Sequence, residues 1–242
     1  MGAFLSCSEA PPVRSHATLL QDAERAMLQA QWDRAGSLYE QFLADNPADP
    51  QRAEIRSQIG KCRLGGGKPE PALRAFDQAL NDSPPPALKW DILFRRAVAL
   101  RMMGDFARAV EGFRQVGAAS TSERGRSVTN DELHYEYATA LFRTGNFPAG
   151  QAELKLVSPT GPYERELALR LGLGAYSVQV GAFGNEDLAR AEAGKLSAQV
   201  RGIPGTPPRF VVLAGHFAKY DEAQRELSRL QRQGYTDAFI LP

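Results

Sequence analysis

The chain has 242 residues, of which 43% are hydrophobic and 24% charged, so it is long and apolar enough for two cores and is not a wholly disordered chain. Its formal net charge of +1 gives no electrostatic basis for binding nucleic acid or an anionic membrane surface. Its two cysteines, Cys7 and Cys62, imply no disulfide framework, and no apolar run reaches the length of a transmembrane helix.

Residues 1–15 are predicted to be a disordered tail or a lipoprotein tether. The opening stretch MGAFLSC has two interpretations. Gly2 and Ser6 fit the short pattern for N-myristoylation, whereas FLSC is similar to the end of a bacterial lipobox in which Cys7 carries the lipid. Only six residues precede Cys7, and a lipobox follows a longer apolar region, so this interpretation implies a start farther upstream.

Residues 16–172 contain an internal repeat with four units. Each unit has a small residue, and these are spaced by 37, 37 and 41 residues: Ala35, Ala72, Ala109 and Gly150. A larger apolar residue follows four positions later, at Tyr39, Phe76, Phe113 and Leu154, and a turn residue stands five positions before, at Ala30, Gly67, Gly104 and Gly145. The pattern predicts four helix pairs that pack on their neighbours, with the extra length in the polar segment 118–131.

This layout resembles that of tetratricopeptide repeats (TPR), with Gly60 and Ala97 in first helices and Pro47 and Pro84 closing the first two units. The resemblance implies an all-α solenoid whose first helices form a concave face that holds a helix or an extended peptide of a protein partner. The positions that this family pattern places on the concave face are Met27, Leu64, Phe94, Arg101, Met102, Tyr135, Phe142 and Arg143. Capping of the solenoid is an equally open role for some of them.

The segment after the fourth repeat connects two different patterns. It is either a hinge or a capping helix, and we predict a short helix from about Tyr163 to Leu171 that covers the last repeat, since solenoids need a cap.

The C-terminal part, residues 173–242, contains one strand and helix twice. YSVQVGAF and FVVLAGHF are each followed by small and apolar residues at helical spacing, and the two copies align at a constant offset that places Gly181 over Gly215 and Phe183 over Phe217. With a short strand between the copies and a last one before Pro242, the order is βαββαβ.

This order and the motif V-Q-x-G-x-F resemble the SPOR domain of bacterial envelope proteins. The resemblance implies an α+β domain with a four-stranded antiparallel sheet and two helices on one face. It implies that the other face binds peptidoglycan glycan strands, especially those stripped of stem peptides at the division septum. It also implies a bacterial periplasmic or cell-envelope location.

Strand alternation predicts which side chains face the glycan. Val178 and Val180 are expected under the helices, as are Phe210, Val212 and Ala214. The residues predicted to bind glycan on or beside the open face are Ser177, Gln179, Arg209, Val211, Leu213 and Phe239. Gln179 occupies the signature glutamine of the family, whose amide can donate to and accept from sugars, and Phe239 offers a ring for stacking.

Two alternatives stay open for the sheet. Val211 and Leu213 are also typical of a protein-docking surface, which the repeat region itself is one candidate to cover. The βαββαβ order is shared with RNA-recognition modules, although RFVVLAGHF lacks their aromatic signature and the charge of the domain is nearly balanced.

Catalysis is not predicted. His16, His134 and His216 have no metal-ligand spacing, and no nucleophile lies in a recognisable triad. GGGKP is not a phosphate loop, because Cys62 replaces the expected glycine and Pro69 the hydroxyl residue. We therefore expect a non-enzymatic scaffold with no cofactor or metal, whose partners are glycan strands and an unknown protein or peptide.

Overall fold

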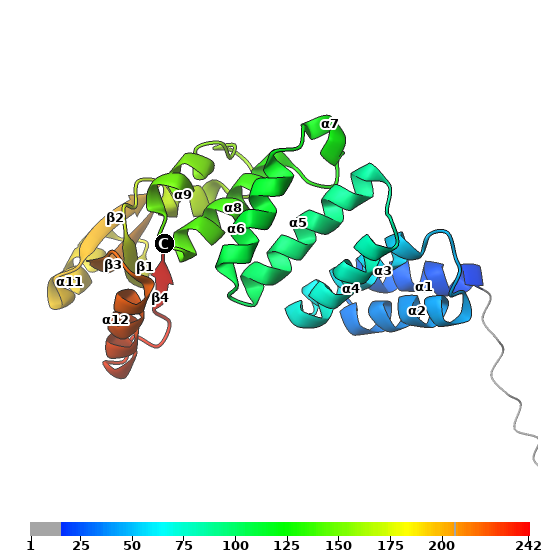
Figure 1. The fold of residues 1–242 in the computed structure, drawn as a ribbon. Helices are drawn as coiled ribbons and strands as arrows, with labels where there is room; N and C mark the ends of the chain where they lie inside the picture. Colours follow the sequence, from blue (N-terminus) through cyan, green and yellow to red (C-terminus); the bar gives the residue numbers. More distant parts are fainter. Residues whose placement is uncertain (1–15, 206) are drawn as a thin grey trace, which may run out of the picture. The chain divides into compact units, whose positions relative to one another are not determined.

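The computed structural model describes residues 16–205 and 207–242 (Figure 1). The chain forms two compact units, Met1–Arg95 and Arg96–Pro242, and the division falls inside helix α5 (Pro86–Met102). The fourth predicted repeat and the C-terminal sheet therefore belong to one unit. The predictions for residues 1–15, including lipidation of Cys7, lie outside the described residues.

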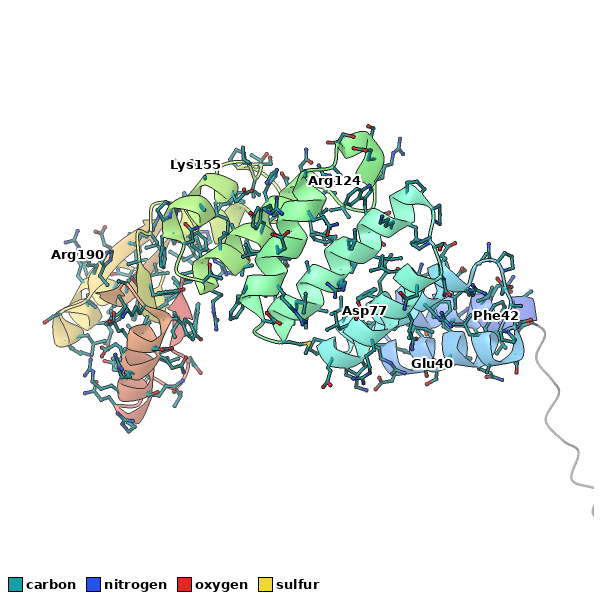
Figure 2. All side chains as sticks on the ribbon, in the orientation of Figure 1. Glu40, Phe42, Asp77, Arg124, Lys155 and Arg190 are labelled. Carbon is teal, nitrogen blue, oxygen red and sulfur yellow. The ribbon has the colours of Figure 1, made fainter. Side chains whose placement is uncertain are left out.

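The first unit consists of antiparallel helices, as the repeat pattern predicts. They are α1 (His16–Leu28), α2 (Trp32–Asp45), α3 (Arg52–Gly65), α4 (Pro69–Asn81) and the first part of α5. Phe42, labelled in Figure 2, lies in a core with Leu19, Leu38 and Ile59. Cys62 belongs to this core, and burial raises the pKa of its thiol to about 11, so the thiol stays protonated near neutral pH.

The repeated small and aromatic residues are packing residues. Ala35, Ala72, Ala109 and Gly150 are all buried, and so are Tyr39, Phe76, Phe113 and Leu154. The glycines of the pattern allow close approach, since a Cβ on Gly150 would lie 2.6 Å from the Phe142 ring and one on Gly60 would overlap the Phe76 ring. The repeat interpretation is therefore confirmed by the way its residues fill space.

The four predicted turns between paired helices share one backbone conformation. Ala30, Gly67, Gly104 and Gly145 have φ values of 54°, 70°, 83° and 83°. Glycine adopts this left-handed conformation without a steric penalty, whereas alanine adopts it only at a steric cost. Ala30 is thus the strained member of the set.

Gly104→Ala is expected to lower the free energy of unfolding by about 1 kcal/mol, because a left-handed L-residue costs about 1–2 kcal/mol and restriction of the unfolded chain returns part of this. Ala30→Gly should act in the opposite direction. A Cβ at Gly104 meets nothing within 4 Å, so denaturant unfolding isolates the backbone effect. Gly184→Ala is the control, since this site is also open and has no positive φ. An equal effect at Gly104 and Gly184 would contradict the explanation.

The second unit continues the solenoid before the sheet begins. After the end of α5 come α6 (Phe106–Gly117), α7 (Thr121–Arg124), α8 (Asn130–Arg143), α9 (Phe147–Leu154) and α10 (Glu164–Arg170). Helix α7 lies in the predicted insertion and begins with a capping box in which Ser120 and Glu123 satisfy each other's backbone N–H groups. Arg124, labelled in Figure 2, is buried and donates to Asn130 Oδ1 over 2.7 Å.

The C-terminal sheet has the predicted βαββαβ order. Its elements are β1 (Tyr176–Phe183), α11 (Glu186–Leu196), β2 (Gln199–Ile203), β3 (Arg209–Phe217), α12 (Tyr220–Arg232) and β4 (Phe239–Leu241). The four strands lie in the order β2-β3-β1-β4, and every neighbouring pair is antiparallel (Figure 1). The fold class predicted from the sequence is confirmed.

Helices α11 and α12 cover one face, and the predicted side chains lie beneath them. Val178 and Ala214 pack with α12, while Val212 and Phe210 pack with α11. The two motif glycines have a defined role. A Cβ on Gly181 would lie 2.9 Å from the Phe183 ring, and one on Gly215 would overlap the Phe217 ring, so each glycine makes room for the aromatic residue two positions on.

The opposite face is covered as well, which corrects the prediction that it is open. Ala168 and Leu169 of α10, together with Leu173, pack against Ile203, Val211, Leu213 and Leu241. Val211 and Leu213 are 3% and 5% exposed and Ser177 is 4% exposed, so none of the three lies on an open surface. The reason is the hydrophobic effect, because the preceding segment supplies apolar side chains that bury this apolar face.

Helix α10 has a second side, which contacts the helices. Its Leu167 lies in a core with Phe142, Phe147, Leu154 and Tyr176. The predicted capping helix near residues 163–171 is therefore present, and it lies between the last repeat and the sheet. The side chain of Gln151, in α9, holds the turn that follows α10. It donates to the Arg170 and Leu173 carbonyls and accepts from the Gly172 N–H.

Candidate functional site

A groove remains between α10 and the end of the sheet at which β3 and β4 begin, and we call it the sheet-edge groove. It has a volume of about 300 Å³ and is lined by Arg165, Glu166, Leu169, Arg170, Gln179, Ala182, Ile203, Arg209, Val211, Phe239 and Leu241. Four of the six residues predicted to bind glycan, Gln179, Arg209, Val211 and Phe239, are thus brought together. The partial cover by α10 narrows the predicted flat face to a groove.

Gln179 and Phe239 form one wall of this groove. They are directly opposite each other in the β1–β4 pairing, so their side chains lie on the same face of the sheet. Phe239 is 45% exposed, and the side-chain oxygen of Gln179 is buried with no hydrogen-bond partner among the described residues. A buried amide oxygen without a donor is a strong acceptor for a ligand N–H or O–H.

The other predicted glycan residues have different surroundings. Arg209 is exposed at the first position of β3, opposite Ile203 of β2. Ser177 donates to the Gly215 carbonyl over 3.1 Å and so holds β1 against β3. Leu213 is covered by α10. Neither Ser177 nor Leu213 lines the sheet-edge groove.

The predicted concave-face residues divide by exposure. Phe94 and Phe142 are 0% exposed, which corrects their assignment as partner-binding residues, because both are packed inside the protein. Met27 and Leu64 are half-buried against the cores of the first unit. Tyr135 stacks on Tyr163 with ring centroids 4.3 Å apart.

The remaining three, Arg101, Met102 and Arg143, line a second groove in the second unit. We call it the arginine groove; it has a volume of about 430 Å³. Its other residues are Met103, Gly104, Phe106, Thr139, Arg170, Tyr176, Tyr220, Ile240 and Pro242. Sequence reasoning missed Arg170 and Tyr220. One sequence signal was available for Tyr220. In the alignment of the two strand–helix copies, this aromatic residue occupies the position at which the first copy has the charged Glu186.

No ligand set for a metal stands out in residues 16–205 and 207–242, where three or more His, Cys, Asp or Glu side chains nowhere converge. In the same residues, no helix combines the length and the apolar character that crossing a bilayer requires.

Models of two known families each match a segment of the chain. A model of the SPOR domain matches residues 172–242, and a model of the tetratricopeptide repeat matches residues 91–119. No curated protein matches the chain.

Solved structures resemble the helical part. A MamA RS-1 ArsTM double mutant is 17% identical, with 64% of this chain and 83% of that chain covered and a TM-score of 0.50. A crystal structure of MamA is 15% identical, with 59% and 75% covered and a TM-score of 0.47. The Sgt2 TPR domain from Aspergillus fumigatus is 20% identical, with 62% and 89% covered and a TM-score of 0.43. At these identities the likeness concerns the fold alone.

Both families are binding families. A SPOR domain implies binding to peptidoglycan and suggests an envelope or periplasmic protein, and tetratricopeptide repeats imply scaffolding between proteins. From the predicted motifs, the observed folds and these matches, we conclude that the chain carries a C-terminal SPOR domain behind helical repeats of the tetratricopeptide type.

Proposed function

We propose that the chain is a non-catalytic adaptor of the bacterial cell envelope, in which the SPOR domain binds glycan strands stripped of stem peptides and the repeats hold a protein partner. The adaptor acts in cell division or in remodelling of the cell wall, in the periplasm, with Cys7 as a lipid anchor. The observation that carries the glycan part is the sheet-edge groove, where an unsatisfied amide oxygen and an exposed aromatic ring lie side by side.

The chemistry of this groove suits a sugar chain. The Gln179 amide offers an acceptor and two donors to hydroxyl and N-acetyl groups, the Phe239 ring offers an apolar face to a pyranose, and Arg209 donates at the rim. Each neutral hydrogen bond contributes about 0.5–1.5 kcal/mol net. A single domain therefore binds weakly and depends on several contacts along a strand.

Gln179→Ala is expected to reduce cosedimentation of the full chain with amidase-treated sacculi by about 2- to 10-fold in apparent affinity, the equivalent of one hydrogen bond. The thermal midpoint should stay nearly unchanged, because the amide oxygen has no partner in the fold to lose. Gln224→Ala is the matched control, since Gln224 is exposed on α12, which covers the opposite face of the sheet.

The outcome that contradicts this proposal is equal sedimentation of the wild-type chain with amidase-treated sacculi, intact sacculi and an unrelated polysaccharide. The sheet would then be a protein-docking surface. The apolar lining of the sheet-edge groove by Leu169, Val211 and Leu241 is the observation that favours that second function.

A further inference from the structure

The arginine groove collects three guanidinium groups from three helices of the second unit. Arg101 comes from the end of α5, Arg143 from the end of α8 and Arg170 from the end of α10. Met102 and Met103 lie at its edge and are 42% and 43% exposed. The groove is therefore both basic and apolar.

Two of the three arginines lack a carboxylate partner. Arg101 pairs with Glu136 at 2.5 Å. In the described part of the chain, neither Arg143 nor Arg170 lies within ion-pair distance of an Asp or Glu. Arg170 instead donates from Nη1 to Thr139 Oγ1 over 3.1 Å. The groove thus holds two arginines that have no Asp or Glu partner among the described residues.

Arg143 lies close to two aromatic rings. Its guanidinium carbon lies 3.7 Å from the centre of the Tyr220 ring and 4.6 Å from that of Phe106, and its Nε is buried without a hydrogen-bond partner. These ring contacts join α12 to the helices, and the guanidinium N–H groups have no hydrogen-bond partner among the described residues. An oriented guanidinium edge is suited to bidentate binding of a carboxylate.

A comparison within the chain shows that this is unusual. A groove of the first unit, with a volume of about 550 Å³, is also lined by basic side chains. There each one has a carboxylate partner: Arg56 with Asp82, Arg63 with Glu40, Lys68 with Asp33 and Arg74 with Glu70. Basic residues alone do not distinguish the arginine groove, whereas unpaired and oriented ones do.

We propose that the arginine groove binds an acidic peptide segment of a protein partner, in which an aliphatic side chain lies next to an Asp or Glu. Arg143 and Arg170 bind the carboxylate, and Met102, Met103 and Phe106 contact the aliphatic side chain, since methionine adapts to irregular apolar shapes. This inference rests on the proposed role of the repeats in recruiting a protein, and it names the chemistry of the segment that they recruit.

The test uses the full chain and end-blocked octapeptides in which Leu is combined with Asp or Glu at varied positions. A second set carries Asn or Gln in place of the acids. Fluorescence anisotropy at low and high salt should show acidic peptides binding at least about 10-fold more tightly than their amide counterparts, with the difference shrinking at high salt because the contact is ionic.

Arg143→Gln and Arg170→Gln should each remove most of that preference. Two variants are needed because Arg143 also contacts two aromatic rings, and Arg143→Gln could fail to fold for that reason. In that case the peptide preference of Arg170→Gln tests the proposal. Arg225→Gln is the matched control, since it removes the same charge at an exposed position of α12 that lines neither the arginine groove nor the sheet-edge groove. Binding of Arg143→Gln to amidase-treated sacculi should equal that of the wild type, because Arg143 does not line the sheet-edge groove.

The proposal is overturned if acidic and amide peptides bind equally to the wild-type chain, or if both arginine variants keep the wild-type preference. It is also overturned if muropeptides, whose stem peptides carry carboxylates, displace the acidic peptides at lower concentration than unlabelled acidic peptides do. Loss of peptide selectivity with intact glycan binding would remove this inference alone, whereas loss of glycan selectivity alone would remove only the proposed glycan function.

Discussion

Phe142→Ala is expected to lower the free energy of unfolding of the second unit by about 3–5 kcal/mol, the range for deleting a fully buried aromatic side chain. The Phe142 ring is 0% exposed and fills the space above Gly150, and its centroid lies 5.5 Å from that of Phe147. Its carbonyl accepts the hydroxyl of Tyr176 from the sheet. Removing the ring therefore leaves a cavity where α8, α9 and β1 meet.

The measurement has to report on the correct unit. Trp32 and Trp90 both belong to the unit Met1–Arg95, so tryptophan fluorescence follows the first unit. Hydrogen exchange of peptides from α8 and β1 follows the second. Phe239→Ala is the matched control, because this phenylalanine is 45% exposed in the same unit and its loss should cost less than about 1 kcal/mol. If Phe142→Ala and Phe239→Ala lowered the protection of α8 and β1 against hydrogen exchange equally, Phe142 would not be a core residue.

Leu169→Asp is expected to destabilise the second unit by about 2–3 kcal/mol, because it replaces an apolar side chain that packs on an apolar layer by a charged one. Leu169 packs on the layer formed by Ile203, Val211, Leu213 and Leu241. At about 2–4 °C per kcal/mol, this corresponds to a fall of roughly 5–10 °C in the thermal midpoint of a unit of this size. Exchange should rise in β2 and β3 as α10 leaves the sheet.

Leu188→Asp provides the control for this change. Leu188 is 61% exposed on α11, so the same substitution should alter stability by no more than about 0.5 kcal/mol. If Leu169→Asp left the midpoint and the exchange of β3 at wild-type values, the burial of the second sheet face by α10 would be wrong.

Much of the fold could be predicted because its residues repeat at fixed distances. The alignment of Ala35, Ala72 and Ala109 predicted the helix pairs, and the alignment of Gly181 with Gly215 predicted two strand–helix copies. In both cases the residue type has a local physical cause, either close helix packing or room for a nearby ring. Local causes recur wherever the local structure recurs, so a single sequence displays them.

The errors concern contacts between parts that are distant in sequence. Strand alternation placed Val211 and Leu213 on the face away from α11 and α12, which is where they lie, but it contained nothing about α10 covering that face. The family pattern placed Phe142 on the concave face, but it did not show that Tyr176 would pack in the same core as Phe142. The face on which a side chain lies is set by the local secondary structure, whereas its burial depends on which distant segments pack against that face.

The contact between Tyr176 and Phe142 bears on how such modules are exchanged during evolution or by gene fusion. Tyr176 belongs to β1 by its backbone, but its side chain lies in the helical core, where its ring meets that of Phe147 edge-on at 4.7 Å. A recombination joint at residue 172 would separate this side chain from its cavity and leave Leu167 and Leu169 without their sheet neighbours. The last repeat, α10 and the sheet therefore form one inheritable block, and a working chimera has to move its joint upstream of α8.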